Sequence, residues 1–285
     1  MKKVISIFLS CLLSANFSLM AHDLPKLATN EYGVKQLLLD NQPYVMLAGE
    51  LMNSSASTLE SMALKWQHLK DLNLNTILLA VTWEQLEPEE GKFDFAWLDK
   101  AVALADKYKL KVVMCTSTAT PPVWLSRKYP EILIKYEDGT LLDHGARQHA
   151  SFASPRYREL SYKMIEKLAQ HYGNDPRIVG WQLDNEPAVQ FDYNQSAEVA
   201  FRDFLRNKYH NNIKELNDAW GTAFWSEVYS AFDEITLPKT AQMFMNHHQI
   251  LDYRRFAARQ TNDFLNEQCL LIKKHARNQW VTTNY

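Results

Sequence analysis

Short apolar runs separated by amphipathic helical stretches recur along this chain, and this alternation restricts its fold more than any other feature. Residues 44–51, 76–83, 111–117 and 179–183 are apolar at consecutive positions, as in strands buried on both faces. Helical periodicity follows at residues 59–72, 95–108, 155–172, 197–209, 213–220 and 243–276, and residues 281–285 are typical of a fifth strand. The alternation predicts a parallel sheet with helices outside it.

The ends of these strands favour a barrel over a doubly wound sheet. They carry the side chains of Glu50, Trp83, Thr116 and the pair Asn185–Glu186, and no glycine-rich phosphate loop follows the first strand. Five strands already occupy the 285 residues, whereas a complete barrel has eight. The predicted fold class is therefore α/β, of the (β/α)8 TIM-barrel type and incomplete, with about five of the eight βα units.

The first 21 residues have the composition of an export signal. Lys2 and Lys3 precede an apolar run at residues 4–13, and Ala21 is a small residue at a suitable cleavage point. The run is too short to remain as a spanning anchor. Residues 1–21 are thus predicted to be a cleaved signal peptide. The mature protein, residues 22–285, is expected to be exported to the periplasm or the medium, without a membrane anchor.

The charge argues against a nucleic-acid-binding protein, and the cysteine content argues against a disulfide or a cysteine metal site. The formal net charge is −2, which gives no basic surface for a nucleic-acid partner. After signal cleavage two cysteines remain, Cys115 in a predicted strand and Cys269 in a predicted helix. They are interpreted as buried free thiols and not as a disulfide or a metal pair.

The strand at residues 179–183 leads into the clearest candidate site. Asn185 and Glu186 follow its end, and Pro187 then stops the strand because it has no N–H to donate. A carboxylic acid beside an amide at a strand tip suits acid/base chemistry on a sugar. The alternative is that Asp184 and Glu186 only cap the next helix or pair with an arginine, and the residues alone leave both interpretations open.

Several longer stretches together point to a family. Residues 83–95, 119–125, 129–131, 145–149, 180–186, 219–226, 251–256 and 281–284 resemble glycoside hydrolase family 42 β-galactosidases, which are retaining (β/α)8 glycosidases. Residues 47–56 are similar instead to family 35-like galactosidases. The resemblance spans nearly the whole mature chain and identifies residues 22–285 as the N-terminal part of a glycosidase barrel.

The resemblance implies a role for three residues. Glu186 matches the catalytic acid/base, Asn185 the amide that binds the hydroxyl beside the anomeric carbon, and Arg147 an arginine of the −1 sugar subsite. For Arg147 the alternative is a salt bridge that braces a loop. Trp83 and Trp124 are interpreted as structural and not as sugar platforms, whereas Glu50 is a weaker candidate for substrate binding.

The implied reaction is hydrolysis of terminal non-reducing β-D-galactosides with retention of configuration, without a cofactor. It needs a second carboxylate, the nucleophile, which in this clan stands at the tip of the seventh strand and is expected beyond the last residue here. Many members carry a cysteine zinc cluster, but residues 149–153 and 189–200 contain no cysteine, so no metal is expected. The alternative function is a truncated, non-catalytic remnant with at most weak sugar binding. Because full-length members are often oligomers, the resemblance leaves a homo-oligomer open.

Overall fold

A five-stranded parallel sheet organises the protein, as the sequence predicts. The computed structural model describes residues 23–52, 58–145, 147–241 and 243–284. The strands lie side by side in chain order, and each pairs in parallel with the next. They are β4 (Ala48–Glu50), β5 (Thr76–Ala80), β6 (Lys111–Cys115), β7 (Ile178–Gln182) and β8 (Trp280–Thr282). Sequential parallel order is the arrangement of the strands in a TIM barrel.

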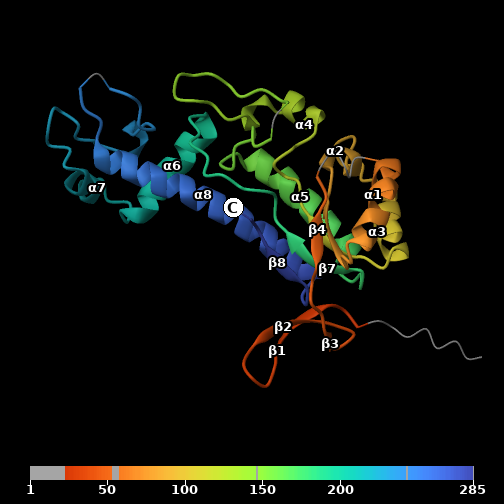
Figure 1. Ribbon diagram of the computed structural model, residues 1–285. Helices are drawn as coiled ribbons and strands as arrows, with labels where there is room; N and C mark the ends of the chain where they lie inside the picture. Colours follow the sequence, from red (N-terminus) through yellow and green to blue (C-terminus); the bar gives the residue numbers. More distant parts are fainter. Residues whose placement is uncertain (1–22, 53–57, 146, 242, 285) are drawn as a thin grey trace, which may run out of the picture.

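Helices connect the strands and pack beside one another. Helix α1 (Leu59–Asp71) contacts α3 (Ala96–Lys107), and α5 (Pro155–Tyr172) lies along α8 (His247–His275) (Figure 1). Shorter helices, α2 (Trp83–Leu86) and α4 (Val123–Lys128), and 3-10 turns at Pro130–Ile132 and Phe232–Glu234 lie in the connections. The sequence patterns predicted the long helices within a few residues, but they did not predict α4 inside the loop before α5.

Local sequence explains where the helices begin. The Ser154 hydroxyl caps α5 by accepting a hydrogen bond from Tyr157 N, and Pro155 occupies the first turn, where its missing N–H costs nothing. In α1 the cap is Thr58, whose side chain accepts from Ser61 N at 3.1 Å. By residue type Ser57 is another candidate for this cap, with Glu60 three positions later as in a capping box, but Ser57 lies outside the described residues.

The described residues form two hydrophobic cores, and α8 belongs to both. The larger core lies between the sheet and its helices, and the smaller one joins α6 (Gln195–Lys208), α7 (Ile213–Trp220) and the first half of α8. Tyr253 and Phe256 of α8 are buried in the smaller core, and Phe264 and Ile272 in the larger. With 29 residues, α8 is about 44 Å long and crosses from one core to the other (Figure 1). Among the described helices, none has the length and apolarity needed to cross a bilayer.

A glycine makes the last strand pairing possible. Gly180 in β7 lies opposite Trp280 in β8. A Cβ atom at position 180 would lie 2.2 Å from the Trp280 indole, which is far inside contact distance. The sequence places glycine in the middle of this strand because the tryptophan ring covers its backbone.

A small antiparallel sheet precedes the barrel strands, and the sequence patterns did not predict it. Its strands are β1 (Lys26–Thr29), β2 (Lys35–Leu39) and β3 (Gln42–Pro43), and it lies at the bottom of Figure 1 below β4. The β2–β3 turn places Asp40 and Asn41 at positive φ, a conformation that these two residue types tolerate. The Tyr44 hydroxyl then donates to Asn75 O at 2.9 Å and anchors the sheet beside β5.

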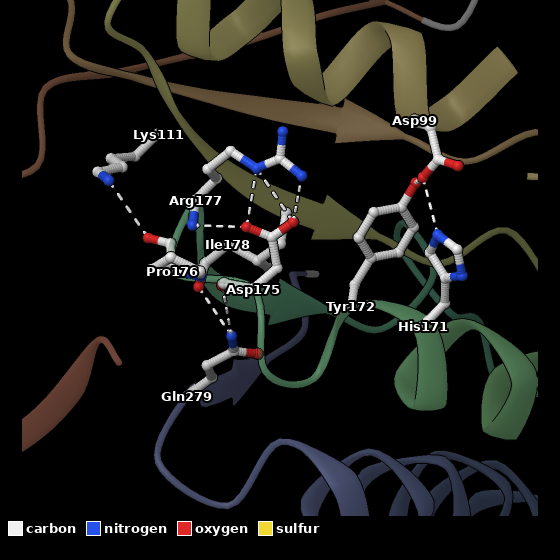
Figure 2. Close-up of polar contacts among 9 residues, drawn as sticks. All are labelled: Asp99, Lys111, His171, Tyr172, Asp175, Pro176, Arg177, Ile178 and Gln279. Atoms are coloured by element: carbon white, nitrogen blue, oxygen red, sulfur yellow. Dashed lines mark hydrogen bonds and ion pairs between the residues drawn. The ribbon is translucent and has the colours of Figure 1, made fainter. Parts of the chain in front are cut away.

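Polar side chains brace the amino ends of the strands (Figure 2). Asp99 of α3 accepts hydrogen bonds from the Tyr172 hydroxyl at 2.7 Å and from His171 Nε2 at 2.8 Å. Arg177 pairs with Asp175 at 2.5 Å just before β7. In barrels this end contributes to stability, and the catalytic groups lie at the carboxyl ends of the strands.

Candidate active site

A cavity of about 490 Å³ opens at the carboxyl ends of the parallel strands. Its volume lies within the range of small-molecule sites, about 300–1,000 Å³. The walls come from the tips of β4 to β7 and the loops that follow them: Glu50, Leu51, Met52, Leu78, Ala80, Cys115, Thr116, Ser117, Ala119, Thr120, Arg147, Gln182, Asp184 and Asn185. Two of the three residues predicted to act on a sugar, Arg147 and Asn185, therefore line one cavity.

The third predicted residue, Glu186, pairs with Arg147 beside this cavity. Arg147 Nη2 lies 2.6 Å from Glu186 Oε2, although the two residues are 39 positions apart. The side chains are 50% and 54% exposed, so water screens the attraction and the pair is worth at most about 1 kcal/mol. A ligand that offers other partners can open such a pair. The contact fits a loop-bracing role in the free protein and a sugar-binding role alike.

The backbone that carries Glu186 is held by two side chains that sequence reasoning did not single out. Glu186 has a φ of +48°, which is rare for a residue with a side chain. Gln148 Nε2 donates to its carbonyl oxygen at 2.8 Å, and its N–H donates to Asn284 Oδ1 at 3.0 Å. Asn284 also donates to Asn185 Oδ1 at 2.7 Å. Asn284 follows the end of the next strand, β8. A polar residue just after a strand end is the sequence signal by which Asn284 could have been identified.

Asp184 is a buried brace, neither a helix cap nor a partner of an arginine. Its side chain accepts hydrogen bonds from the Thr118 hydroxyl, from Ala119 N at 3.0 Å and from Gln268 Nε2 at 3.3 Å. Burial raises the pKa of Asp184 above its ordinary value, although these donors partly oppose the shift. The carboxyl group thus ties the tip of β7 to the loop after β6 and to α8.

The tryptophans near the site are structural, in agreement with the sequence interpretation. Trp83 is fully buried, and its Nε1 donates to Glu87 Oε2 at 2.8 Å. Trp124 Nε1 donates to the backbone oxygen of Glu87 at 2.9 Å. Glu50, by contrast, lies on the cavity wall, where its predicted role in substrate binding stays a prediction.

The two cysteines in the part of the chain that the structure describes are not paired with each other. Cys115 is buried at the end of β6, and Cys269 is half-buried in α8. In the segment after Glu186, Asp192 is buried and accepts hydrogen bonds from Lys135 N at 3.0 Å and Asn194 N at 2.9 Å. Over the described ranges, no three His, Cys, Asp or Glu side chains gather as a metal ion requires.

Comparison with known proteins agrees with this architecture. A family model described as β-galactosidase, glycoside hydrolase family 42, matches residues 55–285. A β-galactosidase from Thermus thermophilus is 41% identical over 206 residues, which cover 71% of this chain and 32% of the relative. The β-galactosidase BgaH from Haloferax lucentense is 37% identical over 205 residues, 71% of this chain and 31% of the relative. The chain thus spans about a third of the length of the curated relatives it matches.

Solved structures give the same assignment. A β-galactosidase from the haloarchaeon Halorubrum lacusprofundi superposes with a TM-score of 0.74 at 33% identity, over 84% of this chain and 36% of that chain. A catalytic mutant of a family 42 β-galactosidase from G. stearothermophilus superposes with a TM-score of 0.78 at 30% identity, over 84% of this chain and 35% of that chain. From the parallel strand order, the cavity at the strand tips and these matches, this chain belongs to glycoside hydrolase family 42.

Proposed function

We propose that this chain carries the acid/base half of a retaining β-galactosidase site, with Glu186 as the acid/base and Arg147 and Asn185 as sugar-binding residues. One observation carries the proposal: an ion pair and an amide, from two segments far apart in sequence, meet at a cavity on the carboxyl edge of the sheet. Membership of a family described as β-galactosidase supports the choice of substrate class.

The three side chains have different roles in the reaction. The glycosidic oxygen is a poor leaving group, and the Glu186 carboxyl group protonates it as the bond to the anomeric carbon breaks. In the second step the Glu186 carboxylate takes a proton from the attacking water. Arg147 turns its fork of N–H donors from Glu186 to the sugar hydroxyls. Asn284 already uses the Asn185 amide oxygen, so the amide nitrogen faces the ligand hydroxyl.

Between the two steps, the retaining mechanism needs a second carboxylate about 5–5.5 Å from the first, which attacks the anomeric carbon. No residue of the five described strands is assigned this role, because the family places it on the seventh strand. The whole reaction is therefore proposed for a polypeptide that contains this site and the nucleophile.

The test is hydrolysis of a nitrophenyl β-D-galactoside by the protein that the source cell makes, compared with its Glu186→Gln variant. The variant keeps the shape of the side chain but cannot transfer the proton, so hydrolysis is expected to fall by at least a hundredfold. The intact mass of each sample shows how long its polypeptide chain is. Equal hydrolysis by both proteins would refute the role of Glu186. Galactose binding without hydrolysis in either would support the non-catalytic remnant.

Two further proposals concern location and assembly. We propose that the protein is exported, because residues 1–21, all of which lie outside the described range, have the pattern of a signal peptide. N-terminal sequencing of the exported form tests this. We also propose self-association, which is supported by the exposed rings of Phe224, Trp225 and Phe244: Phe224 stacks on Trp225, and Phe244 contacts Trp225 at a tilt. Sedimentation of the purified protein measures it, and a monomer at all concentrations would refute it.

A further inference from the structure

Glu186 has a backbone conformation that its own sequence disfavours. Its φ is +48°, in the left-handed region that residues with a side chain rarely adopt. Pro187 follows it, and a proline favours extended backbone in the residue before it. A strained conformation persists only where the surrounding structure holds it, and such strain is most frequent at functional sites. The contacts to the Glu186 backbone therefore decide where this side chain begins.

Gln148 closes a ring of hydrogen bonds around the tip of β7. Asp184 Oδ1 accepts from Ala119 N at 3.0 Å, and Ala119 O accepts from Gln148 N at 2.7 Å. Gln148 Nε2 then donates to Glu186 O at 2.8 Å and completes the ring two residues beyond Asp184. Because Asp184 is buried, this ring ties the carbonyl group of Glu186 to a fixed point in the protein.

Asn284 holds the same segment from the side of β8. Its Oδ1 accepts from Glu186 N at 3.0 Å, and its Nδ2 donates to Asn185 Oδ1 at 2.7 Å. The neighbouring Thr283 hydroxyl donates to Leu183 O at 2.8 Å, so the segment that carries Asn284 is itself attached beside the end of β7. Side chains from two distant segments thus bind both backbone polar groups of Glu186, its N–H and its carbonyl oxygen.

The carboxyl group of Glu186, in contrast, is not fixed by burial. It is 54% exposed, and a ligand that offers other partners can open its pair with Arg147. Once the pair opens, the position of the carboxyl group relative to a sugar depends on the backbone from which the side chain extends. A displacement of about 1 Å in an active site can lower the rate about a hundredfold. The contacts to the backbone therefore matter for proton transfer and not only for stability.

We infer that Gln148 and Asn284 are positioning residues, which hold Glu186 where its carboxyl group reaches the glycosidic oxygen. Their role rests on the proposed function. In the first step the Glu186 proton passes to the glycosidic oxygen, which keeps the electron pair of its breaking bond to the anomeric carbon. The described cavity wall includes Arg147 but not Gln148, so Gln148 acts through Glu186 and not on the sugar.

The experiment measures kcat/KM for two galactosides whose leaving groups need this proton to different degrees, with the protein that the source cell makes. Methyl β-D-galactoside must be protonated as methanol leaves, whereas 2,4-dinitrophenyl β-D-galactoside releases a stable anion. Gln148→Ala should lower kcat/KM about a hundredfold for the methyl galactoside and less than about threefold for the dinitrophenyl galactoside. Asn284→Ala also releases the Asn185 amide, so both values should fall, that of the methyl galactoside about tenfold further.

Two more variants separate positioning from a loss of stability. Gln148→Met keeps the length of the side chain without its N–H donor, and it should change the ratio of the two kcat/KM values as Gln148→Ala does. Gln190→Ala is the matched control, because the Gln190 amide also binds backbone, with Nε2 donating to Ala150 O at 2.9 Å and Oε1 accepting from Phe152 N at 2.8 Å. Any loss of folded protein in this control should lower both values equally and leave their ratio unchanged.

Gln148 is not a positioning residue if Gln148→Ala and Gln148→Met lower both values by the same factor, or lower neither. The proposed function survives that result when Glu186→Gln still slows the methyl galactoside more than the dinitrophenyl galactoside. If Glu186→Gln leaves the ratio unchanged, or if the wild type hydrolyses neither galactoside, the proposed function fails and the positioning role fails with it.

Discussion

Removal of the Asp184 side chain should destabilise the protein far more than removal of its charge alone. Asp184→Ala takes the acceptor from three donors, those of Thr118, Ala119 and Gln268. Each buried donor without a partner costs about 1–3 kcal/mol. Because Gln268 Nε2 and the Thr118 hydroxyl are 3.4 Å apart and can bond to each other, the net expected loss is about 3 kcal/mol.

Asp184→Asn should cost much less, about 1 kcal/mol or below. The new amide oxygen can accept from Ala119 N, and its NH₂ group can face the Thr118 oxygen. Within the described residues, Gln268 Oε1 is buried without a partner, so a flip of this amide supplies an acceptor for the same NH₂ group. The assay is urea unfolding followed by tryptophan fluorescence. A loss for Asp184→Ala below about 1 kcal/mol, or equal losses for both variants, would refute the brace.

The pH dependence gives an independent check of the same residue. Burial raises the pKa of Asp184, so the folded state holds the proton more tightly than the unfolded state. The stability that this proton contributes is present below the unfolded pKa and is lost as the pH rises through the folded pKa. The free energy of unfolding of the wild type should therefore fall relative to that of Asp184→Asn as the pH rises above about 4, the ordinary pKa of an aspartate. A relative rise would contradict the burial argument.

Three other predictions concern residues outside the sugar-binding set. Burial alone would raise the pKa of Asp252, but hydrogen bonds from Lys208, Tyr209 and Trp220 outweigh it, and the pKa is lowered. Asp252→Asn should therefore lower the free energy of unfolding, measured in urea at pH 7, by about 2 kcal/mol. The difference from the wild type should shrink as the pH falls. Trp83→Phe should cost about 1–3 kcal/mol, since it leaves Glu87 Oε2 without its donor, yet galactose affinity in calorimetry should not change. Burial raises the pKa of Cys115 to about 12, so mass spectrometry should find it unalkylated by iodoacetamide at pH 8 until the protein is unfolded.

Sequence patterns predicted best those helices whose ends are marked by a capping residue, a proline or a glycine. The bounds of α5 match the prediction because Ser154 and Pro155 mark its start and Gly173 follows its last residue. The small sheet β1–β3 was missed because its strands are short and partly polar, so the segment resembles an irregular lead. Helix α4, with six residues, is too short to show periodicity.

The site was only partly predictable for a different reason. Periodicity locates a strand tip, and so it placed Asn185 and Glu186, but it does not say which distant side chain meets them. Only the resemblance to a family pointed to Arg147. The role of Asp184 could not be inferred, because a carboxylate at a strand tip has the same sequence signal whether its oxygens are open to a ligand or, as here, accept hydrogen bonds from buried donors. Burial of a polar group is decided by packing between segments far apart in the chain.

Helix α8 also influences which parts of the protein unfold together. One face of its first half completes the smaller core, and its second half completes the larger, so neither core can unravel without exposing apolar surface on the same helix. Amide hydrogen exchange should therefore show α8 among the slowest segments along its middle turns, with α6 and α5 opening together with it as one cooperative unit. A helix with few shared contacts would fray from either end. This one links the stability of the sheet edge that carries the cavity to a cluster of helices whose core residues do not line that cavity.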